Sequence, residues 1–379
     1  MNNGNFEPKP GSLLFDSLKD KKGIILAANP RIALVTRGIF KAAKEVDAAL
    51  ILELARSECD LSGGYTGLNP ADFSARSKQA AQEVGFDIWA LHADHIGIKK
   101  GTKEDIEGTK ELVSGQIDAG FTSFAIDASH LFNFQGGNLR EELSDNIDAT
   151  TQVARHIHEK MGGKEYGLEV EVGEIGREDE QGRVLTQPDE AVTFIKALNE
   201  NGVNPQVLAI ANGSVHGNTY DAQGNLVEQV SIDIPQTIAV AKALEDNNLG
   251  VRIAQHGITG TPRDLIHNHF PHGDIVKGNV ATFYQNMVWD IFKVYEPELY
   301  NDIWNWTLDT YRDSAQGKAD NEIFGKYCKF AIKQFFDRIY SVHDDTIKII
   351  DTLAYAETLI FLKAFKAEGT AQIVRNAMG

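Results

Sequence analysis

The chain of 379 residues contains only two cysteines, Cys59 and Cys328. Two thiols cannot build a disulfide framework or a thiolate zinc site, so any metal would be held by His, Glu and Asp side chains. The low cysteine content fits a reducing compartment. Residues 1–10 are polar and lack the apolar core of a signal peptide. No apolar run approaches the ~18 residues of a membrane span, and we therefore expect a soluble, cytoplasmic protein.

Basic residues are also few. The 37 Lys and Arg residues are outnumbered by 54 Asp and Glu residues, which gives a formal net charge of −17. This balance argues against nucleic acid, whose phosphates need Lys and Arg. A protein this acidic must bind a small anion through local donors or a metal. The sequence also lacks a Gly-x-Ser-x-Gly elbow, a Cys–His signature and a Walker-type loop.

Short apolar runs alternate with longer segments of helical period from residue 23 to about residue 296. Runs of this kind are typical of parallel strands buried on both faces by helices. The predicted strands are 23–28, 48–55, 86–91, 123–127, 166–172, 206–211, 251–255 and 274–279. Eight strand–helix units predict an α/β protein with a (β/α)₈ TIM barrel, and a doubly wound open sheet is the alternative.

The rest of the chain has a different pattern. Residues 297–379 have helical periodicity, many aromatic side chains and no strand alternation, which predicts a C-terminal helical extension. We expect it to pack against the barrel or across a subunit interface, in a homodimer or larger homo-oligomer. The sequence thus divides into an N-terminal segment (1–22), a catalytic barrel (23–296) and the extension.

Histidines and acids gather where predicted strands end, which is where barrel enzymes carry their chemistry. These residues are His92, Asp94 and His95 on the third strand, Asp127 on the fourth, Glu169 and Glu171 on the fifth, His216 after the sixth and His256 after the seventh. His95, His216 and His256, with Glu171 or Asp127 available, would suit Zn²⁺ with an open position. Taken singly, each of these histidines could equally be a buried, hydrogen-bonded structural residue.

Other residues leave alternatives open. We interpret His92 as structural, and the remaining seven histidines as surface or packing residues. The turn Gly257-Ile-Thr-Gly260 opens a helix and could bind an anion through its N–H groups, or be a plain tight turn. A Schiff-base lysine in a barrel would lie within a strand, where Lys277 is the candidate; its amine could instead pair with a buried carboxylate.

Several motifs resemble those of class II, metal-dependent fructose- and tagatose-bisphosphate aldolases over nearly the whole predicted barrel. They are His92-Ala-Asp94-His95, Glu169-Val-Glu171-Val-Gly173, Gly176-Arg-Glu178-Asp179, Val215-His216-Gly217 and His256-Gly257-x-x-Gly260. The resemblance implies a zinc-dependent lyase of carbohydrate metabolism, as in glycolysis, with a monovalent cation as an optional second ion. It implies that Asp94 is the acid/base at the cleaved bond and that Glu178 or Asp179 handles the proton at the nucleophilic carbon.

The same resemblance implies that the substrate is a sugar phosphate. Its dihydroxyacetone-phosphate-like group would contact Gly217, Gly257, Thr259, Gly260, Asn279 and Thr282. Three departures concern the phosphate contacts. The turn has Ile258-Thr259 where the family usually has a second glycine and a serine, Ala281 replaces an aspartate, and no lysine follows His216-Gly217 closely.

A second resemblance is to the companion subunit of tagatose-bisphosphate aldolase and to related sugar epimerases. It is carried by the segments 63–73, 94–97 and 281–283. Three hypotheses follow. The first is an aldolase acting through a zinc-stabilised enediolate, the second is a sugar or sugar-acid epimerase on the same site, and the third is a non-catalytic stabilising subunit. His216 and His256 favour an enzyme, because a structural subunit has no use for a complete ligand set.

Overall fold

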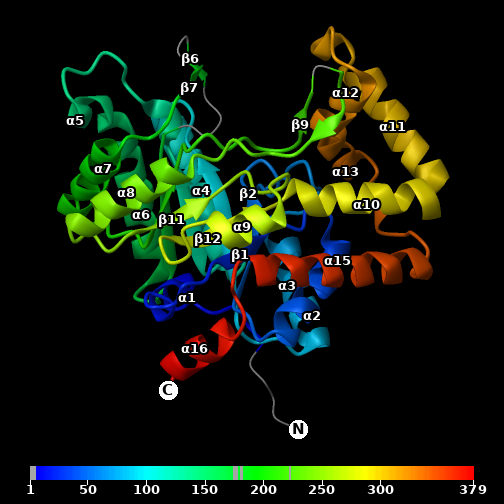
Figure 1. The fold of residues 1–379 in the computed structure, drawn as a ribbon, viewed down its shortest axis with the longest axis horizontal. Helices are drawn as coiled ribbons and strands as arrows, with labels where there is room; N and C mark the ends of the chain where they lie inside the picture. Colours follow the sequence, from blue (N-terminus) through cyan, green and yellow to red (C-terminus); the bar gives the residue numbers. More distant parts are fainter. Residues whose placement is uncertain (1–5, 174–177, 180–181, 222) are drawn as a thin grey trace.

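The computed structural model describes residues 6–173, 178–179, 182–221 and 223–379, with the backbone alone for 178–179 and 182–183. Its centre is a closed barrel of parallel strands in the spatial order β1-β12-β11-β8-β5-β4-β3-β2. These are β1 (Ile25–Ala28), β2 (Leu50–Ala55), β3 (Trp89–Gly97), β4 (Ser123–Asp127), β5 (Gly167–Val172), β8 (Val207–Ile210), β11 (Arg252–Gln255) and β12 (Ile275–Val280). The predicted (β/α)₈ barrel is confirmed (Figure 1).

The strands form where both faces of the chain are buried. Every residue of β1, β4, β5, β8 and β12 is buried, as expected of parallel strands covered by helices. The third strand differs most from its predicted range, because it starts three residues later and runs on to Gly97. His92, Asp94 and His95 therefore lie within the strand and not beyond its end.

Helices surround the barrel and follow most strands. They are η1 (Ala33–Val35), α2 (Thr36–Glu45), α3 (Pro70–Val84), α4 (Lys103–Asp118), η2 (Ser129–Leu131), α5 (Leu139–Glu142), α6 (Ser144–Met161), α7 (Pro188–Glu200), α8 (Ile234–Asp246), α9 (Arg263–His269) and α10 (Thr282–Tyr295). Helix α7 begins after Gln187, which is its N-cap and forms a capping box with Glu190. The preceding residue, Thr186, donates from Oγ1 to Val172 O and so ties its loop to β5.

Short elements at both ends of the barrel were not predicted. Helix α1 (Gly11–Ser17) closes the end where the strands begin, with Gly11 N donating to Thr122 O at 3.0 Å. At the opposite end lie two small hairpins, β6 (Glu178–Asp179) with β7 (Gly182–Arg183) and β9 (Thr219–Tyr220) with β10 (Leu226–Val227). The β9–β10 hairpin extends the loop that carries His216, so this loop is more than a simple connection.

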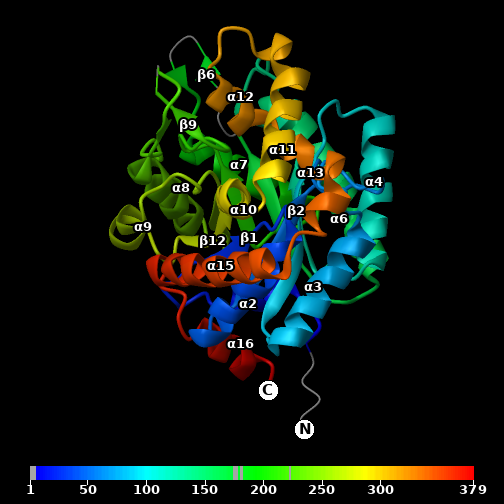
Figure 2. The ribbon, with the colours of Figure 1, turned by 90° about the vertical axis from the view of Figure 1, so that its right-hand side faces the viewer.

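The C-terminal segment is helical, as predicted. It comprises α11 (Pro297–Tyr311), η3 (Asp313–Ala315), α12 (Asp320–Tyr327), η4 (Cys328–Phe330), α13 (Ala331–Gln334), α14 (Phe336–Ile339), α15 (Asp344–Ala364) and α16 (Thr370–Ala377). Figures 1 and 2 show α12 beside β9 at the end where the hairpins lie, while α15 crosses α2. Within the part of the chain that is described, no helix is long and apolar enough to span a bilayer.

Candidate metal centre

Three imidazoles meet at the carboxyl end of the barrel, one from the last part of β3 and two from the loops after β8 and β11. The ligand atoms of His95, His216 and His256 all lie within 4.8 Å of one another. His95 Nε2 and His256 Nδ1 are 3.1 Å apart, and the ring of His216 is 5.2 Å from that of His95. The rings line a cavity of about 400 Å³. The predicted convergence is therefore present in the structure.

A bulge in β3 brings His95 into this cavity next to Asp94. In a regular strand the two side chains would point to opposite faces. Here the pairing with β4 gains one residue between Ala93 and Ile96, and His95 has a left-handed backbone with φ 38°. Such bulges re-aim side chains and occur beside active sites. The irregularity lets Asp94 and His95 line the same cavity.

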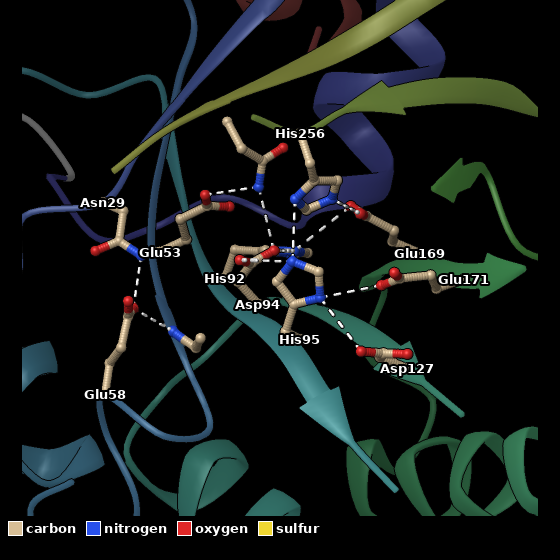
Figure 3. Close-up of polar contacts among 12 residues, drawn as sticks. Asn29, Glu53, Glu58, His92, Asp94, His95, Asp127, Glu169, Glu171 and His256 are labelled. Atoms are coloured by element: carbon tan, nitrogen blue, oxygen red, sulfur yellow. Dashed lines mark hydrogen bonds and ion pairs between the residues drawn. The ribbon is translucent and has the colours of Figure 1, made fainter. Parts of the chain in front are cut away.

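Carboxylates contact a ring nitrogen of two of the three imidazoles, His95 and His256 (Figure 3). His95 Nδ1 lies 3.0 Å from Glu171 Oε2 and 3.4 Å from Asp127 Oδ2, on the ring edge away from His256. His256 Nε2 lies 3.4 Å from Glu169 Oε1. A carboxylate on the second ring nitrogen fixes the tautomer and orientation of a metal-binding histidine. Asp127 and Glu171 thus contact His95 from behind, although His95, Asp127 and Glu171 also form a possible ligand group of their own.

Lys277 lies at the centre of a buried charge network beneath the imidazoles. Its Nζ is 2.7 Å from Glu169 Oε2, 3.2 Å from Glu53 Oε2 and 3.3 Å from Asp94 Oδ1. Burial opposes its charged form, but Glu169 and Glu53 raise the pKa of Lys277 above its ordinary value. A protonated amine is not a nucleophile. Of the two alternatives for Lys277, the geometry favours the ion pair over the imine.

Five buried carboxyl groups surround the single lysine amine of this centre. Glu53, Asp94 and Glu169 pair with Lys277, and Asp127 and Glu171 add two more beside His95. Burial and the neighbouring Asp94 raise the pKa of Glu53 to about 8, while burial and Asp127 raise the pKa of Glu171 to about 8. A cation bound beside them would favour the ionised form of both groups. The donor set and the number of carboxyl groups both fit a divalent metal ion.

Asp94 keeps its charge in this setting. Burial alone would raise its pKa, but His95 and Lys277 hold the pKa of Asp94 well below its ordinary value. Asn279 donates from Nδ2 to Asp94 Oδ1 at 3.2 Å and to Glu53 Oε1 at 2.7 Å, and so fixes both carboxyl groups. An ionised carboxylate held at the wall of the cavity can act as a base.

Five of the six residues predicted to contact the substrate line the same cavity, namely Gly217, Gly257, Thr259, Asn279 and Thr282. Gly257 has φ 68°, and a Cβ there would meet Val215 O at 2.6 Å, so only glycine fits. Gln229 donates to Gly257 O, and Phe283 N donates to Thr259 Oγ1 at 3.2 Å. Gly260 does not line the cavity; its carbonyl accepts from Gln229 N.

The remaining predicted residues fall in different places. His92 is fully buried and bonds Ser123 Oγ at 2.7 Å, in keeping with a structural role. The backbone of Glu178 and Asp179 forms β6, but their side chains lie outside the described part of the chain, so their roles stay predictions. His130, interpreted as a surface residue, is exposed but lines the cavity.

Sequence reasoning missed several residues around the cavity, namely Asn29, Arg31, Glu53, Glu58, Tyr65 and Lys329. Glu53 left a signal, because it is a charged residue inside an otherwise apolar strand. Arg31 directly follows the first strand's Asn-Pro stop. Lys329 belongs to the extension, and no local pattern distinguishes it from other surface lysines.

Comparison with known proteins agrees with this geometry. The sequence profile of the family "Fructose-bisphosphate aldolase class-II" matches residues 12–332. A fructose-bisphosphate aldolase of Staphylococcus aureus is 28% identical over 280 residues, 70% of this chain and 80% of that protein. A fructose-bisphosphate aldolase of Giardia intestinalis is 28% identical over 233 residues, 60% of this chain but only 58% of that protein.

A solved structure shares the fold. The YdjI aldolase of Escherichia coli K12 superposes with a TM-score of 0.59 at 19% identity, covering 94% of this chain and 97% of that one. A (β/α)₈ barrel with histidines and acids gathered at its carboxyl end defines the class as a barrel with a candidate metal site. The chain belongs to the class II fructose-bisphosphate aldolase family. The resemblance seen in the sequence is therefore confirmed.

Proposed function

We propose that this protein is a metal-dependent aldolase that cleaves or forms a C–C bond in a ketose phosphate. The observation that carries the proposal is the meeting of three imidazoles above an excess of buried carboxylates. His95, His216 and His256 would hold one Zn²⁺ ion and leave an open position for substrate. When bound, the ion supplies a Lewis acid for the sugar carbonyl, which stabilises the charge that develops as the C–C bond breaks.

The chain's own groups would move the protons. Asp94 would take the proton of the hydroxyl on the carbon whose bond breaks. As that hydroxyl becomes an aldehyde, the electron pair of the C–C bond passes to the ketone-bearing fragment as an enediolate. Glu178 or Asp179 would then protonate its carbon. Asn279 would keep Asp94 oriented, as its hydrogen bond to that carboxylate suggests.

The glycine turn supports a phosphorylated substrate. Gly257 and Thr259 line the cavity together with Gly217 and Thr282, and backbone N–H groups in such a turn favour an anion. An epimerase using the same site, and a non-catalytic stabilising subunit, are the competing functions. Asp94 Oδ2 lies 3.9 Å from His95 Nε2 in the same cavity, and an acid placed beside the imidazoles favours an enzyme over a purely structural role.

The test combines metal analysis with product analysis. We expect purified protein to hold one zinc per chain and His256→Ala to lose metal and activity together. The control is His158→Ala, at an exposed position of α6, which should keep both. A panel of ketose mono- and bisphosphates, with and without chelator, then separates the functions. Release of a triose phosphate indicates a lyase, whereas an isomeric sugar of unchanged carbon number indicates an epimerase. Metal and activity retained in His256→Ala would refute the ligand assignment.

A further inference from the structure

A second cavity adjoins the metal centre. It has a volume of about 530 Å³ and lies between the His216 loop, the start of α10 and the C-terminal extension. The two cavities share five lining residues, namely Arg31, His216, Gly217, Thr282 and Lys329. The extension therefore forms one wall of a space that opens directly onto the candidate metal ligand His216.

The charge of this second cavity is opposite to that of the chain. Four cationic side chains line it, Arg31, Lys318, Lys326 and Lys329, against the single carboxylate of Glu322. Lys318 already pairs with Glu322 at 3.0 Å. The whole chain has a net charge of −17. A basic cavity in so acidic a protein focuses anions locally.

Lys329 is half-buried at the junction of the two cavities. Its Nζ lies 5.5 Å from the ring centre of Tyr65 and 5.3 Å from that of Phe330. Among the described residues it forms no ion pair. Burial and the nearby Arg31 lower the pKa of Lys329. An anion bound between Lys329 and Arg31 would offset both the burial of the lysine charge and its repulsion by the guanidinium.

Arg31 faces the same junction and is held rigidly. Its Nε donates to Glu58 Oε1 at 2.7 Å, and its Nη1 donates to Thr282 Oγ1 at 3.1 Å and to Gln285 Oε1 at 3.3 Å. Its orientation is thus fixed without any ligand. Thr282 is one of the residues expected to contact phosphate, so Arg31 brings a positive charge directly to that position.

We infer that Lys329 of the C-terminal extension, together with Arg31, forms an anion subsite that binds a phosphate group of the sugar and so determines specificity. The inference rests on the proposed function for the identity of the sugar, but not for the anion itself. It makes the extension part of the substrate site. The chain lacks the lysine that is usual in the family soon after His216. Arg31 and Lys329, which line the same cavity as His216, would supply the positive charge in its place.

The test compares Lys329→Met with Lys326→Met, a matched control whose exposed lysine lines only the outer cavity. Binding of inorganic phosphate and of a non-cleavable hexitol phosphate is measured by calorimetry on the zinc-loaded protein, with the unphosphorylated hexitol as reference. Loss of one charge-assisted contact should weaken binding of both phosphates by about 10- to 100-fold in Lys329→Met. Hexitol binding and zinc content should not change.

Kinetics supply an independent readout. For a ketose phosphate that is cleaved, KM should rise by a similar factor in Lys329→Met with little change in kcat, and Lys329→Arg should restore KM. Equal phosphate binding in Lys329→Met and wild type would overturn the inference, as would an equal loss in Lys326→Met, which would indicate a diffuse field. Lys329→Gln gives the same comparison if methionine is not tolerated. Because the binding assay needs no turnover, an inactive protein that still shows the Lys329 effect would refute the aldolase and keep the subsite.

Discussion

Arg31 Nε and Glu58 Oε1 lie 2.7 Å apart at the side of the cavity lined by the three imidazoles, in an ion pair that joins the loops after β1 and β2. Glu58 also accepts hydrogen bonds from Tyr65 OH at 2.6 Å, from Asn29 Nδ2 at 2.6 Å and from Ala55 N at 2.7 Å. One buried carboxylate therefore gathers four donors. It fixes the guanidinium that we assign to the anion subsite.

The first prediction concerns the stability that Glu58 provides. Glu58→Ala removes one partner of a buried pair and leaves Arg31 uncompensated, so the free energy of unfolding should fall by about 3 kcal/mol. Glu58→Gln keeps the shape and most acceptors, and should cost less. Urea unfolding at neutral pH measures both. Equal stability of Glu58→Ala and wild type would contradict the prediction.

The same carboxylate gives the stability a pH dependence. Burial alone would raise its pKa, but Arg31 and the Tyr65 hydroxyl lower the pKa of Glu58 below its ordinary value of 4.5. A lowered pKa stabilises the fold above the ordinary value, and this stabilisation is lost as the pH falls through the lowered pKa. Wild type should therefore lose more stability than Glu58→Gln when unfolding is compared at pH 7 and at acidic pH below 4.5.

The second prediction concerns the carboxylate behind His95. Glu171→Gln keeps the size of the side chain but weakens the partner of His95 Nδ1, 3.0 Å away. Replacing such a partner typically lowers metal affinity by about 10- to 100-fold. Competition with a zinc chelator measures the change, with Glu159→Gln on the exposed face of α6 as control. Unchanged affinity in Glu171→Gln would show that this carboxylate does not orient the ligand.

The third prediction separates metal catalysis from an imine. Because Lys277 is held protonated by Glu169, Glu53 and Asp94, borohydride added with a ketose phosphate should leave no covalent adduct on the chain. Intact-mass analysis detects the expected absence. A mass gain mapped to Lys277 would instead establish the Schiff base. Lys277→Met should also destabilise the protein by about 3 kcal/mol, since it strands buried carboxylates.

The fourth prediction tests whether the extension supports the His216 loop. Gly325 of α12 packs directly on the Tyr220 hydroxyl, and a Cβ there would collide with it. Asn218 donates to the same hydroxyl at 3.1 Å and accepts from Asn286 Nδ2 at 2.8 Å. Gly325→Ala should therefore displace β9, cost about 1–3 kcal/mol of stability and weaken zinc binding through His216.

A rescue and a control make this test specific. Tyr220→Ala combined with Gly325→Ala should recover most of the stability, because the colliding ring is gone. Gly108→Ala, on α4 with nothing near the added methyl, should stabilise the protein by about 0.5–1 kcal/mol. If the changes in unfolding free energy of Tyr220→Ala and Gly325→Ala simply add in a double-mutant cycle, the contact between Gly325 and Tyr220 does not explain the loss of stability.

Much of the barrel could be predicted from the sequence because its signals are local. Most strands are short runs buried on both faces, and His216 and His256 follow such runs. The division into an N-terminal segment, a barrel and an extension stays a prediction. So does the homo-oligomer.

The parts that could not be predicted depend on residues distant in the chain. The bulge that places His95 beside Asp94 arises in the pairing of β3 with β4, and no pattern within β3 reveals it. Whether Lys277 is a nucleophile or a counter-ion depends on carboxylates from β2, β3 and β5. Lys329 reaches the cavity only because η4 packs against the barrel mouth, beside Tyr65.

The segment from the end of α15 to the start of α16 returns to the end of the barrel where the strands begin, and it contacts the starts of β1 and β2. Phe365 O accepts from Ile24 N at 2.9 Å, just before β1, and Thr370 Oγ1 accepts from Ala49 N at 2.8 Å, just before β2. Both bonds involve residues translated after all eight strands. The first two strands leave the ribosome earliest. The hydrogen bonds at their amino ends, however, can form only after residues near the end of the chain have been translated.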